Sequence, residues 1–169
     1  MKKTVLLALA LLLVTPLALR AQTVEEAAKI EARAAIEQAI LDYVEGLYNV
    51  EPSRIERSVH PDLAKVGYWR HNADTWYRTT RQDYDKVMEL AQTWNTDGHV
   101  DVATAPREIT LLDVMDQTAS AKLVAEWGID YLHLAKIEGR WMIMNVLWQT
   151  RPEGYSKQGG QVRKVVEGQ

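Results

Sequence analysis

Three histidine–aspartate pairs are the residues of this sequence best suited to chemistry. The members of each pair lie two or three positions apart: His60 with Asp62, His71 with Asp74, and His99 with Asp101. A histidine beside a carboxylate can act as a base or help to hold a metal ion. All three pairs fall in segments predicted to be turns, where aspartate is common because its side chain bonds the nearby backbone. The turn interpretation is the simpler one, and we predict no metal site.

Another histidine, His133, lies in the middle of a predicted strand among apolar residues. Its facing depends on the loop at residues 138–139. A two-residue loop would place His133 on the side of Met142, whereas a three-residue loop with a glycine bulge would place it with Asn145. Asn145 itself either bonds within the core or points at a ligand, because a buried amide needs partners.

Large aromatic residues are distributed unevenly, with six Trp, seven Tyr and no Phe. Trp and Tyr carry a polar group on a large apolar body, so a core built from them needs hydrogen-bond partners or opens onto a wet cavity. The candidate ligand-binding residues are His60, Tyr68, Trp76, Met88, Trp94, Trp127, His133, Trp141 and Asn145. Core packing is the more common use of such apolar residues, and a pocket wall is the alternative that we carry forward.

Several common functions lack their motifs in this chain. It has no Ser-His-Asp order, glycine-rich phosphate loop, HExxH helix or CxxC motif, which argues against the usual hydrolases, nucleotide binders and redox enzymes. The formal net charge of −3 disfavours nucleic acid, which needs a basic footprint. We therefore predict no cofactor and no nucleic-acid partner.

The first 21 residues have the parts of a secretory signal peptide. Two lysines precede an apolar run from Val5 to Val14, and small residues lie near Ala21, after which we expect cleavage. The run is short for a membrane span, although a retained anchor is the alternative. The chain has no cysteine, so it has neither a disulfide nor a lipid-bearing cysteine. We predict a soluble protein of the bacterial periplasm or exterior, without a membrane partner after cleavage.

The remaining sequence predicts one domain over residues 22–151 and a flexible tail over 152–169. Thr23 and Glu26 form a capping box, and the helix that they begin should continue to about Asn49. A short helix over residues 52–58 should precede a turn at His60-Pro61-Asp62. Two short strands around residues 72–74 come next, followed by a helix from about Arg81 to Trp94 with its N-cap at Thr80.

The last third of the chain predicts a sheet. Short strands are expected at residues 100–102 and 108–115, with a turn at 116–117, and further strands run through 118–150. The final strand does not alternate, and we place Trp141, Ile143 and Leu147 on one face, with Met142, Met144, Val146 and Trp148 on the other. A strand that is apolar on both faces should be covered on both. Since the helices cover one face, we predict a homodimer through the outer face.

Three segments resemble a known family: AIEQAILDYVEGLY (35–48), SVHPDLAKVGY (58–68) and DYLHLAKIEGRW (130–141). Together with the order of elements, they resemble the nuclear transport factor 2-like superfamily, and within it the branch described as putative lumazine-binding proteins. This resemblance implies an α+β fold in which a curved, antiparallel or mixed sheet wraps around three helices as a cone-shaped, cystatin-like roll with an internal pocket.

The superfamily also contains isomerases, dehydratases and polyketide cyclases. Those that resemble ketosteroid isomerase use an aspartate base with a tyrosine and a protonated acid as donors. Here the candidate bases are His60, Asp62 and Asp130, and the candidate donors are Tyr43 and Tyr48. No local motif ties any of them to the catalytic positions, so the catalytic residues stay unassigned.

The sequence therefore predicts an exported protein that binds a small apolar or aromatic ligand inside the cone. One alternative is an isomerase-, dehydratase- or cyclase-like enzyme with a histidine or aspartate base. The other is a dimeric interaction module that has no ligand.

Overall fold

The computed structural model describes residues 3–72 and 74–152, with side chains described from Gln22 onward. In chain order, the elements are α1 (Lys3–Tyr48), α2 (Pro52–Ser58), β1 (Val59–Arg70), β2 (Trp76–Arg78), α3 (Tyr84–Thr93), β3 (Glu108–Val114), β4 (Thr118–Ala125), β5 (Gly128–Ile137) and β6 (Arg140–Gln149). The chain divides into two compact units, Met1–Ala35 and Ile36–Gln169. Among the described residues, no helix has the length and hydropathy needed to span a bilayer. The expected tail lies almost entirely outside the described residues.

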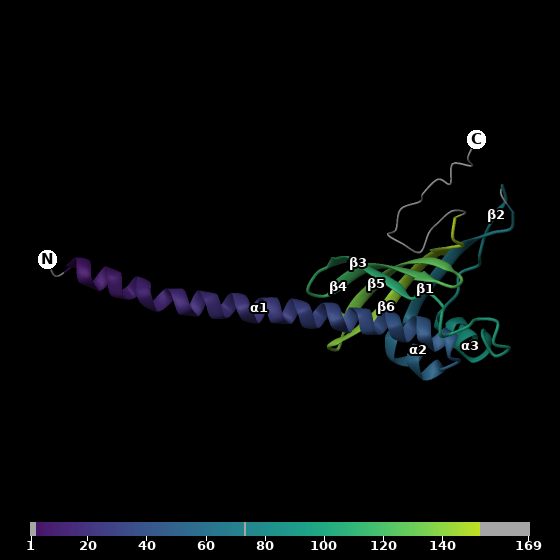
Figure 1. Ribbon diagram of the computed structural model, residues 1–169, viewed down its shortest axis with the longest axis horizontal. Helices are drawn as coiled ribbons and strands as arrows, with labels where there is room; N and C mark the ends of the chain where they lie inside the picture. Colours follow the sequence, from purple (N-terminus) through teal and green to yellow (C-terminus); the bar gives the residue numbers. More distant parts are fainter. Residues whose placement is uncertain (1–2, 73, 153–169) are drawn as a thin grey trace. The chain divides into compact units, whose positions relative to one another are not determined.

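The second unit is an α+β fold with one six-stranded sheet in the order β2-β1-β6-β5-β4-β3. Strands β1 and β6 are parallel, and the other neighbouring pairs are antiparallel. The sheet is therefore mixed, and it curves over the helices on one of its faces (Figure 1). The predicted fold class is confirmed.

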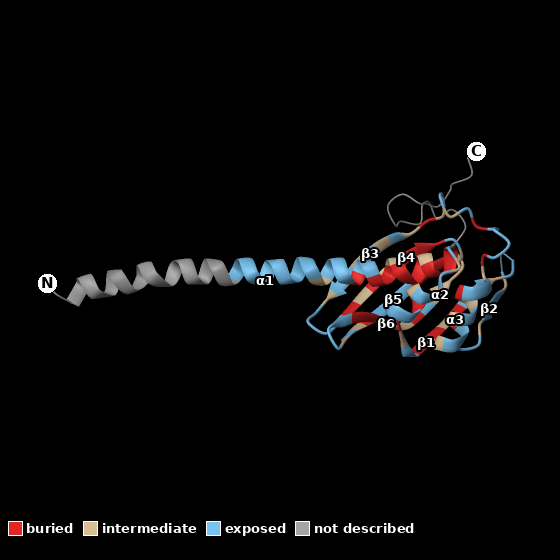
Figure 2. Cartoon of the chain, turned by 90° about the horizontal axis from the view of Figure 1, so that it is seen from below, coloured by how far each residue is buried: buried red, intermediate tan, exposed pale blue. Residues whose placement is uncertain are grey.

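The part of α1 in this unit supplies the centre of the core. Its apolar side chains recur at helical spacing, as a face packed against a sheet requires: Ile36, Ile40, Tyr43, Val44 and Leu47 are all buried. Opposite them, Ala121, Leu123, Leu132 and Ile143 of the sheet are fully buried. Figure 2 shows the buried residues of α1 beside those of the strands.

Two predicted helix starts differ from the structure. Helix α1 does not begin at Thr23, because the helical backbone continues from Lys3 through that position. Helix α3 begins three residues later than predicted. Its N-cap is Asp83, whose side chain accepts a hydrogen bond from the Lys86 amide. The backbone of Gln82 instead exchanges two hydrogen bonds with Lys65 of β1, at 2.7 and 2.9 Å, which ties the approach to α3 to the sheet.

Two short segments also differ from their predictions. His60-Pro61-Asp62 is not a turn but part of β1, whose pairing with β6 is irregular between Val59 and Ala64. That irregularity lets a proline occupy the strand without a ladder hydrogen bond. Residues 100–102 form no strand, and the chain turns there instead. The buried side chain of Asn95 fixes this turn by bonding the backbone N–H and C=O groups of Val100.

The facing of the last strand was predicted wrongly for Val146, Leu147 and Trp148. The β5–β6 loop has two residues, Glu138 and Gly139, both with positive φ. Beyond it, Leu134 pairs with Ile143 but His133 pairs with Asn145, so Met144 is an extra residue that reverses the facing of the strand. Consequently Trp148 turns toward the helices.

The partner strand confirms this reversal. Trp148 pairs with Asp130, which is fully buried, whereas Leu147 pairs with Tyr131. Leu147 and Tyr131 are 46% and 45% exposed and lie on the outer face. His133 shares that outer face with both Met142 and Asn145, a combination that neither predicted loop would give.

Candidate functional site

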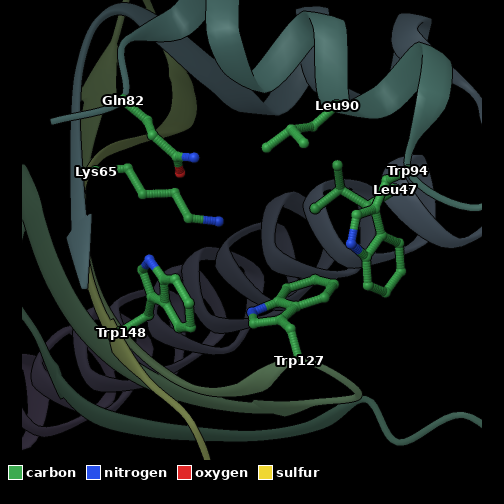
Figure 3. A pocket seen from close by; sticks show the side chains of 7 residues that line it. All are labelled: Leu47, Lys65, Gln82, Leu90, Trp94, Trp127 and Trp148. Carbon is green, nitrogen blue, oxygen red and sulfur yellow. The ribbon is translucent and has the colours of Figure 1, made fainter. Parts of the chain in front are cut away.

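A cavity of about 170 Å³ lies between the sheet and helix α3. Its lining comes from six separate elements and connections: Leu47 of α1, Lys65 of β1, Gln82 before α3, Leu90 and Trp94 at α3, Trp127 between β4 and β5, and Trp148 of β6. We call this space the tryptophan cavity. Figure 3 shows its two ends, with the amide, amine and indole nitrogens of Gln82, Lys65 and Trp148 at one and apolar groups at the other.

The apolar end is held by contacts between aromatic rings. Trp94 and Trp127 meet edge to face, with centroids 5.3 Å apart. Tyr48 stacks on Trp94 at 6.0 Å and touches Trp127 at 5.7 Å. The Tyr48 hydroxyl is itself fixed, because it donates to the Pro106 carbonyl at 2.6 Å and accepts from the Glu126 amide at 2.7 Å. The tryptophan wall is therefore a preformed surface.

A chain of buried polar groups lies behind the other end. Lys65 Nζ donates to the Tyr43 hydroxyl at 2.7 Å, and that hydroxyl donates to Asp130 Oδ2 at 3.1 Å. The second carboxyl oxygen, Oδ1, accepts from Trp127 Nε1 at 2.8 Å. Lys65 is 5% exposed and Asp130 is fully buried. The four residues come from α1, β1, β5 and the β4–β5 turn, so the fold assembles them from distant parts of the sequence.

Burial disturbs the protonation of all three ionisable members. It raises the pKa of Asp130, although the nearby Lys65 opposes that rise. Burial also lowers the pKa of Lys65, although the nearby Asp130 opposes that decrease. The pKa of Tyr43 lies well above its usual value, first because of burial and then because of the Asp130 charge. Each shift favours the uncharged form, as expected for groups removed from water.

Trp148 contributes a buried indole N–H that has no hydrogen-bond partner among the described residues. Such a group is costly to leave unpaired, by about 1–3 kcal/mol, and is uncommon in folded proteins. The Trp148 nitrogen lies at the polar end of the tryptophan cavity, near the Lys65 amine (Figure 3).

The structure places the sequence-predicted residues in several different locations. Trp94 and Trp127 line the tryptophan cavity. Trp141 is buried and Met88 half-buried outside the lining, while Tyr68 and Trp76 are each 42% exposed on the β1–β2 hairpin. Asn145 donates to the Ala64 carbonyl at 2.8 Å.

The two histidines of the candidate set lie elsewhere. The ring of His60 accepts a hydrogen bond from the Asp62 amide, a local contact within β1. His133 borders a second hollow of about 400 Å³ with Met115 and Met144. Within the described part of the chain, no group of three or more histidine, aspartate or glutamate side chains is placed to hold a metal ion. Of the candidate bases and donors, the structure brings together Asp130 and Tyr43.

Sequence reasoning missed five of the lining residues: Leu47, Lys65, Gln82, Leu90 and Trp148. Lys65 could have been found, because it alternates with Leu63 and Gly67 on the buried face of β1. A lysine at an inward position of a strand is rare enough to mark a functional or paired group. Trp148 was missed because the extra residue at Met144 is not visible in the pattern of the strand.

Residues 31–149 match the model of the family described as "Putative lumazine-binding". The chain belongs to this family. No curated protein is similar enough in sequence to match it.

Solved structures of NTF2-like proteins share the fold. One from Silicibacter pomeroyi DSS-3 is 18% identical, covers 75% of this chain and 98% of its own, and superposes with a TM-score of 0.53. One from Methylobacillus flagellatus KT is also 18% identical, covers 73% of this chain and 94% of its own, and gives a TM-score of 0.55. At this level of identity the likeness establishes the fold alone. This member of the family described as "Putative lumazine-binding" thus has an NTF2-like fold, and its ligand must be argued from its own cavity.

Proposed function

We propose that the protein binds a small, planar, mostly apolar ligand in the tryptophan cavity. The observation that carries this proposal is that Trp94, Trp127 and Trp148 border an open volume instead of filling it. Protein cores are normally packed as densely as organic crystals. A concave apolar space with a few convergent polar groups is the usual form of a small-molecule site.

The volume limits the size of the ligand. An engineered apolar cavity of about 150 Å³ holds benzene, and the tryptophan cavity measures about 170 Å³. One ring, or two fused rings at most, would fit. The family description names lumazine, which is a flat molecule of two fused rings with carbonyl acceptors, so it is the first compound to test.

The polar end favours a ligand that accepts hydrogen bonds along one edge. Lys65 can donate further hydrogen bonds besides the one to Tyr43, and the indole N–H of Trp148 has no hydrogen-bond partner among the described residues. A ring carbonyl or ring nitrogen directed at these two groups would be bound more tightly than a hydrocarbon of the same size. The Trp127 and Trp94 rings would contact the apolar part of the ligand.

Tryptophan fluorescence titration with lumazine tests the proposal. Leu90→Trp should fill the cavity and abolish binding, whereas Leu112→Trp should leave it unchanged, because Leu112 is 55% exposed outside the lining. Native mass spectrometry of protein purified from its own host should also reveal a retained small molecule. Equal affinity of both variants for lumazine would place binding outside the tryptophan cavity and contradict the proposal.

We further propose that the protein is exported and acts as a homodimer. Export is supported by the signal-peptide pattern of residues 1–21. Dimer formation is supported by the exposed cross-strand pair Tyr131 and Leu147 on the outer sheet face. Leu147→Lys should then give a monomer by light scattering at micromolar concentration. A monomeric unmodified protein at that concentration would contradict the dimer.

A further inference from the structure

Lys65 is a buried amine that borders an open cavity, and this combination is uncommon. Its neighbours on the inward face of β1, Leu63 and Gly67, are buried as well. The side chain directs its amine into the space between Gln82 and Trp148 (Figure 3). A lysine amine that has lost its hydration favours the neutral, nucleophilic form. The Lys65 amine is therefore a nucleophile that a ligand in the tryptophan cavity would contact.

A chain of groups able to move protons begins at that amine. Lys65 Nζ contacts the Tyr43 hydroxyl, and the same hydroxyl contacts the Asp130 carboxyl. Lys65 and Asp130 together have one proton to share, and Tyr43 connects them. The ammonium–carboxylate state becomes the amine–carboxylic acid state by transfer of one proton along this chain. Burial favours the second state, because it contains no charge.

We propose that Lys65 forms an imine with a small aromatic aldehyde or ketone that enters the tryptophan cavity. This inference rests on the proposed function, since the ring must first occupy the cavity. The neutral amine forms a bond to the carbonyl carbon, and one proton moves from nitrogen to the former carbonyl oxygen. The resulting hydroxyl takes the Asp130 proton through Tyr43, the C–O bond breaks, and water leaves. The products are a protonated imine and the Asp130 carboxylate, so atoms and charge balance.

The surroundings of the amine would stabilise this product. The Lys65 nitrogen lies 5.5 Å from the ring centroid of Trp127 and 5.9 Å from that of Trp148, whereas at Tyr43 it contacts the hydroxyl and not the ring face. Aromatic faces attract cations at such distances. A protonated imine keeps its positive charge on the same nitrogen, so these rings and the Asp130 carboxylate would act on it as they act on an ammonium group.

An aromatic carbonyl compound suits the space better than an aliphatic one. The aryl group would lie against Trp127 and Leu90, which form the apolar end of the cavity, while the carbonyl carbon reaches Lys65. Benzaldehyde is only slightly larger than benzene, which fills a cavity of about 150 Å³. It therefore serves as the probe.

Borohydride trapping provides the test. Benzaldehyde is incubated with the full chain at neutral pH, borohydride is added, and peptide mass mapping locates the resulting benzyl amine. We expect one adduct, on Lys65. Lys65→Arg retains a cation but forms no imine, so the adduct should vanish, whereas Lys86→Arg, which replaces an exposed lysine of α3, should leave it unchanged. Circular dichroism establishes that both variants fold.

A parallel titration with benzyl alcohol separates this inference from the proposed function, because the alcohol has the same ring and no carbonyl. Quenching of tryptophan fluorescence by benzyl alcohol, together with labelling spread over surface lysines or unchanged in Lys65→Arg, would overturn the imine and leave the binding proposal intact. If benzyl alcohol fails to bind and Lys65 is unlabelled, both proposals are contradicted.

The role of Tyr43 as a positioning residue has its own readout. Tyr43→Phe removes the hydroxyl that links Lys65 to Asp130 but keeps the ring beside the amine. The rate of trapping should fall and its pH dependence should change, because the amine loses its path to the carboxyl group. A pH profile identical to that of the unmodified protein would exclude a proton path through Tyr43.

Discussion

The indole of Trp148 occupies the space where any residue other than glycine at position 67 would place its Cβ atom. Gly67 and Trp148 pair in the register of β1 with β6, and a Cβ on Gly67 would overlap three atoms of the indole ring. The bare backbone of β1 therefore lets Trp148 lie flat beside it and border the tryptophan cavity. Glycine is used here for close approach, since no positive φ is recorded at this position.

Gly67→Ala should therefore displace Trp148. Overpacking of a fitted core typically costs 1–3 kcal/mol, so urea denaturation should detect a loss of roughly that size, accompanied by a change in tryptophan fluorescence. Gly98→Ala is the control, because a Cβ there meets nothing within 4 Å and only its positive φ of 68° carries a cost, of about 1–2 kcal/mol. An unchanged emission spectrum in Gly67→Ala would contradict the displacement.

The sequence predicts much of this fold because its helices and strands carry periodic apolar patterns. Helix α2 and strands β4 to β6 appear where the pattern indicates them. The tryptophan cavity could be predicted only in part. Trp94 and Trp127 were recognisable as candidates because they are large and aromatic. The facing of Trp148 depends on one extra residue at Met144. A bulge of that kind arises from tertiary packing and leaves no periodic signal.

The polar chain behind the cavity was equally inaccessible to sequence reasoning. Tyr43 and Asp130 were separate candidates, 87 positions apart in the chain. Only the packing of α1 against β5 brings their side chains together. Lys65 of β1 is the third member. Its inward position follows from the alternation of the strand, but its contact with Tyr43 cannot be read from that pattern.

Lys65 and Asp130 should behave as a buried pair when they are replaced. Lys65→Met leaves the buried Asp130 carboxyl group without its partner, and breaking a buried pair typically costs up to about 3–5 kcal/mol. The double variant Lys65→Met/Asp130→Asn removes both ionisable groups and should recover a large share of that stability. Urea denaturation of the single and double variants measures this. Purely additive losses in the double variant would show that the two groups do not interact.

The stability of the protein should also depend on pH through the same pair. The pKa of Asp130 is raised in the folded state. The stability that Asp130 contributes is therefore fully present below about pH 3.9, its pKa in the unfolded chain. This stability is lost as pH rises through the raised pKa of the folded state. The pKa of Lys65 is lowered in the folded state. Between that lowered pKa and about pH 10.4, the pKa of lysine in the unfolded chain, the unfolded state therefore binds more protons than the folded state. Stability therefore recovers as pH approaches that value.

The difference in unfolding free energy between the unmodified protein and the double variant should thus pass through a minimum at intermediate pH. Subtracting the double variant removes the titration of all other groups that the two proteins share. Denaturation midpoints at intervals from pH 4 to pH 10 give this difference. A difference independent of pH would mean that neither Lys65 nor Asp130 changes its pKa on folding.

The N-terminal cap of α3 sets the position of the wall formed by Leu90 and Trp94. Asp83 caps the helix by accepting from the Lys86 amide at 3.0 Å, whereas the sequence pattern had favoured Thr80. Asp83→Ala should destabilise the protein by about 1 kcal/mol, the usual loss for such a cap, because the amide of the first turn loses its partner.

Thr80→Ala is the matched control, since Thr80 is exposed and precedes the Gln82 bridge to β1. Its replacement should change the denaturation midpoint little. Asp83→Ala should also weaken ligand binding in the tryptophan cavity more than Thr80→Ala does, because fraying of the first turn loosens the helix that supplies Leu90 and Trp94. If Thr80→Ala proves the more destabilising change, the helix begins at the earlier position in solution, and the bridge between Gln82 and Lys65 is absent there.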